Sequence, residues 1–310
     1  MKVTLLKLAL VVLISFAACG FIESNAQAAL CTVDGAGDVS CTHNTTTQWY
    51  WWGLAYIPRP VHWQVPQGTA PSGGWPVVYW FEGTSPVYDN NIFTPFNRNY
   101  ADVFGDLFGL VHEAMTVRTL LDDVYGTGKK YAVIAPAPPL STLLMQFWNT
   151  NCVFPYSISA DYYFFNTLFP AVDSGNYGNV NNGRRYASGV SSGGYNTSRM
   201  AITFNGGSTF KALAVQSASY ADCSGAACAL PCSGTAYIPS NHPPTKFYHG
   251  VFDPIVPIAT MYCYYNDLVN MGISTTVDAF TNGGIAGLHG YSTDSYDKTM
   301  GVQAYFNAHQ

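Results

Sequence analysis

Six runs of apolar residues, separated by segments with helical spacing, constrain the fold of this 310-residue chain more than any other feature. Hydrophobicity within each run is continuous rather than alternating, which is typical of strands covered on both faces. The runs occupy residues 75–81, 131–138, 184–191, 210–218, 245–253 and 275–280. Strands that alternate with helices predict an α/β fold, with a mostly parallel central sheet and helices on both faces.

The helical spacing recurs in five segments, which are residues 100–126, 159–172, 194–204, 258–272 and 295–309. No internal repeat, charge run or low-complexity linker divides the chain after its first 28 residues. We therefore expect a single domain over residues 29–310, a length that allows a large core.

The first 28 residues have the pattern of a secretory signal peptide. Lys2 and Lys7 precede an apolar run over residues 8–18, and Ala26-Gln27-Ala28 supplies the small-x-small pattern of a cleavage site. We predict cleavage after Ala28 and export to the periplasm or the medium. A membrane anchor is one alternative, although the run is shorter than the roughly 20 residues that span a bilayer. Lipid attachment at Cys19 is another.

The chain has eight cysteines, of which seven remain after the predicted cleavage. Cysteines of exported proteins form disulfides by default. Cys31 and Cys41 bracket a short loop, and the three cysteines within residues 223–232 are able to close another. A zinc site in that second segment is the alternative, but no further cysteine or histidine pair has finger-like spacing.

Charge and aromatic content narrow the choice of partners. The net charge is −5 and only 10% of the residues are charged, which argues against nucleic acid, because its binding needs clustered Lys and Arg. Aromatic residues make up 15% of the chain. Such a composition suits either an apolar surface as partner or a large aromatic core.

Ser191 is the candidate nucleophile. It lies in the pattern G-x-S-x-G between Gly189 and Gly193, whereas the same pattern around Ser192 fails because Val190 stands two residues before it. In this pattern the serine occupies a sharp turn between a strand and a helix, where flanking Cβ atoms would collide. An apolar run precedes the turn and a helical segment follows it. We therefore prefer the nucleophile to the alternative, an ordinary Gly/Ser loop.

A serine nucleophile needs a base, and the base needs an acid that fixes its orientation. With this type of turn the chain order is Ser, acid, His. Asp253 ends an apolar run and is the predicted acid; its alternative role is that of a turn residue before Pro254. His289 lies in a glycine-rich loop before the last helical segment and is the predicted base, rather than a solvated loop histidine. His249 is interpreted as a structural histidine within a strand.

Backbone amides are the predicted oxyanion donors. The turn directs the N–H of Ser192 toward the site where a tetrahedral oxyanion forms. The second donor should come from the loop after an early strand. We assign it to Thr84 or a neighbouring residue of this loop, because Gly83 lets the chain turn there; Glu82 stands where many hydrolases have histidine. The alternative is that the segment around Gly83 is a simple turn.

With these residues assembled, the chain resembles the secreted polyhydroxyalkanoate depolymerases of the α/β-hydrolase superfamily, particularly the class acting on polyesters with medium-length side chains. The resemblance rests on GVSSGGYNTSRMA (189–201), HGVFDPIVP (249–257) and GLHGYS (287–292), and the first is the most specific. It implies the same roles for Ser191, Asp253 and His289, no separate polymer-binding domain, and no metal or organic cofactor. Residues 49–60 and the extra cysteines depart from the pattern of that family.

The function expected from these features is hydrolysis of a hydrophobic polyester through an acyl-enzyme. Exposed rings, among them Trp51, Trp52 and Trp148, would form a platform for the solid polymer, with core packing as the alternative. A carboxylesterase or lipase acting on small or lipid esters would use the same three residues. A non-catalytic binding protein on a hydrolase scaffold is disfavoured, because all three residues are intact.

Overall fold

The computed structural model describes residues 29–86, 94–98, 110–139, 145–151, 155–221, 238–281 and 288–310. The expected leader peptide, including Cys19, and the cysteine-rich segment 223–232 lie outside these ranges. Within the described part of the chain, no helix is both long and apolar enough to cross a membrane.

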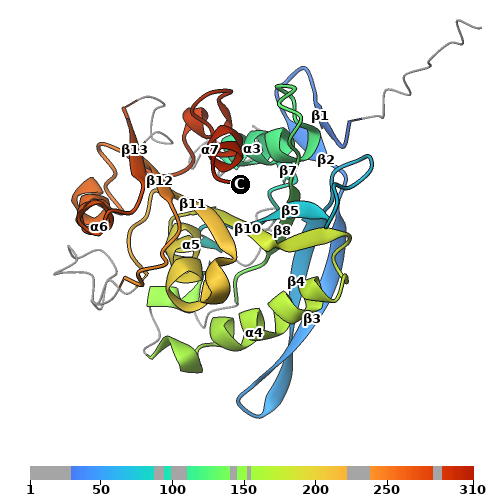
Figure 1. The fold of residues 1–310 in the computed structure, drawn as a ribbon, viewed down its shortest axis with the longest axis horizontal. Helices are drawn as coiled ribbons and strands as arrows, with labels where there is room; N and C mark the ends of the chain where they lie inside the picture. Colours follow the sequence, from blue (N-terminus) through green and yellow to red (C-terminus); the bar gives the residue numbers. More distant parts are fainter. Residues whose placement is uncertain are drawn as a thin grey trace, which may run out of the picture.

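An eight-stranded sheet lies at the centre of the molecule (Figure 1), in the spatial order β13-β12-β11-β10-β5-β8-β4-β3. Six neighbouring strands pair in parallel, and each comes from one of the predicted apolar runs. They are β5 (Trp75–Phe81), β8 (Ala132–Pro136), β10 (Val180–Val190), β11 (Phe210–Gln216), β12 (Thr245–Gly250) and β13 (Thr275–Phe280). The prediction of a mostly parallel sheet is confirmed.

Two antiparallel strands, β3 (Asn44–Trp52) and β4 (Ala55–Gln64), extend this sheet and were not predicted. They form a hairpin whose turn contains Gly53, at a φ of 63° that glycine adopts without strain. Pro58 and Pro60 interrupt the strand pattern of β4. Pairing with β8 begins at Val61. Pro60, which has no N–H, contributes only its carbonyl oxygen on that side, where it accepts the N–H of Ala137 at 3.0 Å.

Helices cover both faces of the sheet, as predicted (Figure 1). On one face lie α3 (Leu110–Asp122) and α7 (Val302–Ala308); on the other lie α4 (Ala160–Asp173), α5 (Ser192–Thr203) and α6 (Ile258–Asn270). Strand β5 is buried along its whole length. Val78 and Trp80 pack in the core on the side of α3 and α7, whereas Val77, Tyr79 and Phe81 pack on the side of α4 and α5.

Several short elements connect the main strands and helices. They are β6 (Ser85–Pro86), β9 (Met145–Gln146) and the 3-10 helices η1 (Asn149–Asn151), η2 (Tyr156–Ile158), η3 (Gly206–Ser208) and η4 (Thr293–Tyr296). The helix expected over residues 295–309 is split into η4 and α7. Gly301 lies between them against the carbonyl oxygen of Asp297, which would be only 2.4 Å from a Cβ atom at this position.

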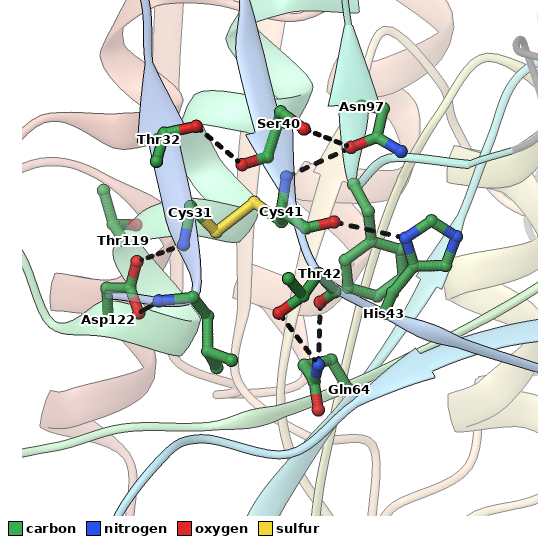
Figure 2. The surroundings of a disulfide bond; sticks show 12 residues. Cys31, Thr32, Ser40, Cys41, Thr42, His43, Gln64, Asn97, Thr119 and Asp122 are labelled. Carbon is green, nitrogen blue, oxygen red and sulfur yellow. Dashed lines mark hydrogen bonds between the residues drawn. A yellow bond between two sulfur atoms is a disulfide. The ribbon is translucent and has the colours of Figure 1, made fainter. Parts of the chain in front are cut away.

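A small sheet of β1 (Cys31–Val33), β2 (Val39–Cys41) and β7 (Asn97–Arg98) lies at the N-terminal end of the described chain. A disulfide joins Cys31 to Cys41 across the first two strands (Figure 2), so the two cysteines that bracket the short loop in the sequence are paired. The backbone N–H groups of Leu30 and Cys31 donate to the carboxylate of Asp122, at 2.8 and 2.9 Å. The disulfide-bonded strands are thereby attached to the end of α3.

Candidate active site

Ser191 occupies the turn between β10 and α5, as its sequence pattern predicts. Its backbone has φ 54° and ψ −124°, a conformation that costs a non-glycine residue free energy and is typical of functional turns. The turn is held in place by its backbone: the N–H of Ser191 donates to the carbonyl of Gln216 at 3.0 Å, and its carbonyl accepts from the N–H of Tyr195 at 3.0 Å.

The glycines around this turn are required by close backbone packing. A Cβ atom at Gly189 would lie 2.3 Å from the carbonyl oxygen of Phe81, and one at Gly193 would lie 2.0 Å from the same oxygen. Side-chain carbons essentially never approach other heavy atoms this closely. The turn therefore packs directly on the backbone at the end of β5, the contact that the glycine pattern predicts.

Asp253 and His289 are joined by a hydrogen bond. Asp253 follows the end of β12 by three residues, and its Oδ2 atom lies 2.7 Å from Nδ1 of His289. Its other oxygen accepts the backbone N–H groups of Ile255 and Val256 at 2.9 and 2.8 Å. Both side chains are buried. A carboxylate that accepts from Nδ1 leaves Nε2 of the neutral imidazole as the proton acceptor.

A second histidine lies beside the same carboxylate. His249 is fully buried in β12, with Nε2 at 2.8 Å from the carbonyl oxygen of Val256 and at 3.4 Å from Oδ2 of Asp253. Burial lowers the pKa of His249, so the imidazole is neutral near pH 7 and donates from Nε2. This hydrogen bond from His249 to Val256 holds the two ends of the loop that carries Asp253 together.

The segment that follows β11 connects the serine turn to the histidine loop. Gln216 accepts from the N–H of Ser191, and the hydroxyl of the next residue, Ser217, bonds both backbone groups of Gly290. Ser191, Asp253 and His289 follow β10, β12 and β13, which run in parallel. Loops that follow parallel strands lie at their carboxyl edge, where α/β proteins bind their ligands.

The predicted oxyanion donors lie beside Ser191. Ser192 is the first residue of α5, so its N–H belongs to the helix terminus that has no intrahelical acceptor. A Cβ atom at Gly83 would lie 3.4 Å from Cβ of Ser191, which puts the loop after β5 against the serine. Thr84, the next residue, is exposed, and Glu82 before it is buried.

Comparison with known proteins assigns the family. No family model matches the chain. The poly(3-hydroxyoctanoate) depolymerase of Pseudomonas fluorescens is 41% identical to it over 275 residues, which cover 88% of this chain and 86% of that protein. The chain belongs to the polyhydroxyalkanoate depolymerase family. This depolymerase-family protein is therefore a serine hydrolase that acts on carboxylic esters.

Solved structures support the fold of this depolymerase-family enzyme. The structure of a thermostable esterase aligns with 90% of this chain, and the alignment covers 70% of the esterase chain, at a TM-score of 0.54 and 14% identity. Thermogutta terrifontis esterase 2, phosphoramylated by tabun, matches 85% of the chain with 94% of its own, at a TM-score of 0.50 and 15% identity. The predicted α/β-hydrolase fold is confirmed.

The three tryptophans predicted to contact substrate lie in two different environments. Trp51 and Trp52 are at the end of the β3–β4 hairpin and are 49% and 44% exposed. Trp148 is only 1% exposed, and its indole N–H donates to the carbonyl of Glu82 at 2.9 Å. Including Trp148 in an exposed platform was wrong, because its ring packs in the core beneath the loop after β5.

Sequence reasoning missed the polar side chains that hold the loop of His289 in this depolymerase-family enzyme. Ser217 and Glu113 contact the two residues that follow the histidine. They are 73 and 178 residues from their partners along the chain, so no local pattern marks them. Tyr291, the partner of Glu113, lies within the GLHGYS motif, which was its only visible signal.

Proposed function

We propose that the chain hydrolyses ester bonds of a hydrophobic polyester of the polyhydroxyalkanoate type, with Ser191 as nucleophile, His289 as general base and Asp253 as the acid that orients it. The observation that carries the proposal is the 2.7 Å hydrogen bond between Asp253 and His289, at the same sheet edge as the strained turn of Ser191. The substrate of the Pseudomonas fluorescens relative supports the polyester assignment.

In the acylation step, Oγ of Ser191 attacks the ester carbonyl carbon while its proton passes to Nε2 of His289. Asp253 stabilises the resulting imidazolium, and the two backbone N–H groups at Oδ1 keep its carboxylate fixed. The tetrahedral oxyanion accepts hydrogen bonds from the N–H of Ser192 and from the amide of Thr84. Collapse of this intermediate breaks the ester C–O bond, and the imidazolium protonates the departing alcohol.

In the deacylation step, a water molecule attacks the acyl-enzyme and gives one proton to Nε2 of His289. The second tetrahedral intermediate uses the same backbone donors. Its collapse returns the proton to Oγ of Ser191 and releases the carboxylic acid. His289 thus acts as base and as acid once in each half-reaction.

Exposed apolar side chains in two places support a solid, apolar substrate. At the hairpin end, Leu54 is 95% exposed beside Trp51 and Trp52. On the loop of the acid, Phe252 and Ile255 are 67% and 51% exposed although Asp253 itself is buried. Exposed apolar groups of this kind mark interaction sites. These two residues lie within two positions of Asp253 in the chain, so a bound polymer surface would contact the loop that carries the proposed acid.

Clearing of polymer suspensions tests the function. Wild-type protein and Ser191→Ala are added to separate suspensions of medium-side-chain polyhydroxyalkanoate, polyhydroxybutyrate and a triglyceride. We expect the wild type to clear the first preferentially and Ser191→Ala to clear none. Clearing of the triglyceride alone would instead assign a lipase or carboxylesterase, and an active Ser191→Ala would refute the serine mechanism.

A second experiment tests the hairpin as the polymer-contacting platform. Trp51→Ala and Trp52→Ala should weaken adsorption to polymer particles and leave hydrolysis of a soluble ester unchanged. Met271→Ala is the control, because it removes a similarly exposed apolar side chain just after α6. Equal losses on polymer and soluble ester would reject the platform.

We also propose that the protein is exported and that its leader is cleaved near Ala28. The Cys31–Cys41 disulfide supports an oxidising compartment. N-terminal sequencing and intact mass of the protein recovered from the medium or periplasm test this proposal. A first residue near Ala29 supports it, whereas an acylated Cys19 or an uncleaved chain contradicts it.

A further inference from the structure

The backbone that follows His289 is held by side chains from two distant parts of the chain. Gly290, the next residue, is bonded by Ser217 at the end of β11. Tyr291, the one after, is bonded by Glu113 of α3. All four residues are buried. Neither Ser217 nor Glu113 takes part in the proposed chemistry, so their contacts with this loop need a separate explanation.

Ser217 makes a reciprocal pair of hydrogen bonds with Gly290. Its Oγ donates to the carbonyl of Gly290 at 2.9 Å and accepts the N–H of Gly290 at 3.1 Å. The backbone of Ser217 has a φ of 44°, and its N–H donates to the carbonyl of Tyr248 in β12 at 2.8 Å. A hydroxyl that satisfies both backbone groups of one residue fixes that residue in position and orientation.

Glu113 anchors the same loop from α3, which covers one face of the sheet. Its Oε1 accepts the hydroxyl of Tyr291 at 2.8 Å and the indole N–H of Trp80 in β5 at 2.6 Å. The rings of Trp80 and Tyr291 are also stacked, with centroids 6.0 Å apart. One buried carboxylate oxygen thereby joins the loop of the base to β5, the strand that precedes the oxyanion loop.

We infer that Ser217, and Glu113 through Tyr291, are positioning residues for His289; the inference rests on the proposed role of His289 as the base. The hydrogen bond to Asp253 fixes Nδ1 of the ring, but it leaves the imidazole free to swing with its backbone. Holding the next two residues removes that freedom and fixes the position of Nε2, the atom that takes the proton of Ser191 in the proposed mechanism. A displacement of 1 Å in a catalytic group costs about a hundredfold in rate.

The first test removes the hydroxyl of Ser217. Ser217→Ala is assayed on a soluble chromogenic ester, so that adsorption to polymer does not enter the rate. We expect kcat to fall by about tenfold to a hundredfold with KM unchanged, because the substrate-binding surface is intact. Ser217→Gly also lacks the hydroxyl but relieves the left-handed backbone, so it covers the case in which Ser217→Ala folds poorly.

Ser219→Ala is the matched control. This second buried hydroxyl, two residues along the chain, donates to the carbonyl of Thr260 in α6 at 2.6 Å. Its removal should lower the melting temperature as much as Ser217→Ala does while leaving kcat unchanged. A merely structural role for Ser217 would give both variants the same kcat.

The second test concerns the carboxylate. Glu113→Gln retains an oxygen that accepts from both Trp80 and Tyr291, whereas Glu113→Ala and Tyr291→Phe break the link to the loop. We expect kcat of Glu113→Gln to exceed that of the other two variants by about tenfold. Equal kcat values for all three would overturn the role of Glu113.

The inference about Ser217 is overturned if Ser217→Ala and Ser217→Gly keep the kcat of the wild type, or if Ser219→Ala loses as much. Failure of the proposed function has a different signature, because His289→Ala or Ser191→Ala would then remain active on the same ester. The two failures are therefore separated within one set of assays.

Discussion

Gly193→Ala tests whether the serine turn must lie directly on the backbone of β5. The added Cβ atom would be 2.0 Å from the carbonyl oxygen of Phe81 and 2.3 Å from that of Glu82. Both obstacles are backbone atoms, which cannot rotate away as a flexible side chain does. Because contacts below 3.0 Å are essentially never observed, the turn and the end of β5 must separate by about 1 Å.

A separation of this size moves Ser191 and the amide of Ser192 relative to the loop that carries Thr84. We expect kcat on a soluble ester to fall by about a hundredfold, which corresponds to about 2.7 kcal/mol of activation free energy. Overpacking should also lower the free energy of unfolding by about 1–3 kcal/mol. Both losses have the same cause, so they should appear together.

The assay is steady-state hydrolysis of a soluble chromogenic ester, with a thermal melt of the same sample. Gly206→Ala is the control, because a Cβ atom there meets nothing within 4 Å; it should retain the kcat and melting temperature of the wild type. The reasoning is refuted if Gly193→Ala matches that control in both measurements.

Three further predictions concern stability. Burial lowers the pKa of His242 to about 4, below the roughly 6.5 of an unfolded chain, so its contribution to stability is complete above about pH 6.5 and is lost as the pH falls toward 4. His242→Gln should therefore reduce the difference in unfolding free energy between pH 7 and pH 5 by about 2 kcal/mol, measured by urea unfolding; an unchanged difference would contradict this. Replacing Cys31 and Cys41 by serine should cost about 3 kcal/mol without changing kcat, and calorimetry that shows no loss of stability would disagree. The buried guanidinium of Arg59 lies 2.7 Å from the carboxylate of Asp161, so Asp161→Ala leaves it without its charged partner and should lower the free energy of unfolding by about 3–5 kcal/mol. Urea unfolding should show a smaller loss for the double variant Asp161→Ala, Arg59→Met. An equal or larger loss would contradict the proposed cost of the unpaired charge.

The sequence predicted the parallel part of the sheet well, because strands buried on both faces need continuous apolar runs. Each of the six predicted strands forms, and the serine turn lies between the predicted strand and helix. Asp253 and His289 were selected by chain order and by their positions, at the end of an apolar run and in a glycine-rich loop, and the structure joins them by a hydrogen bond. These features depend on local pattern and on a fixed chain order, which a single sequence displays.

The features that were not predicted depend on contacts between segments that are distant in the sequence. The β3–β4 hairpin was missed because Pro58 and Pro60 interrupt the strand pattern of β4, although both residues pair with β3 in the structure. Trp148 was wrongly assigned to the surface, because tryptophan occurs both on surfaces and in cores and the sequence does not show that its indole N–H bonds to the carbonyl of Glu82. Ser217 and Glu113 have no recognisable motif, since their partners are far away in the sequence.

If His289 is the base, as proposed, the anchoring of its loop to α3 and to the end of β11 also determines when the protein becomes active as it is made. In the proposed mechanism, Ser191 and His289 act together only after β10, β11 and β12 have paired and Tyr291 has reached Glu113, which precedes it by 178 residues. Such non-local contacts form late and slowly during folding. On refolding, esterase activity should return after the helical circular-dichroism signal. A growing chain should likewise show no activity until the segment with His289 has left the ribosome.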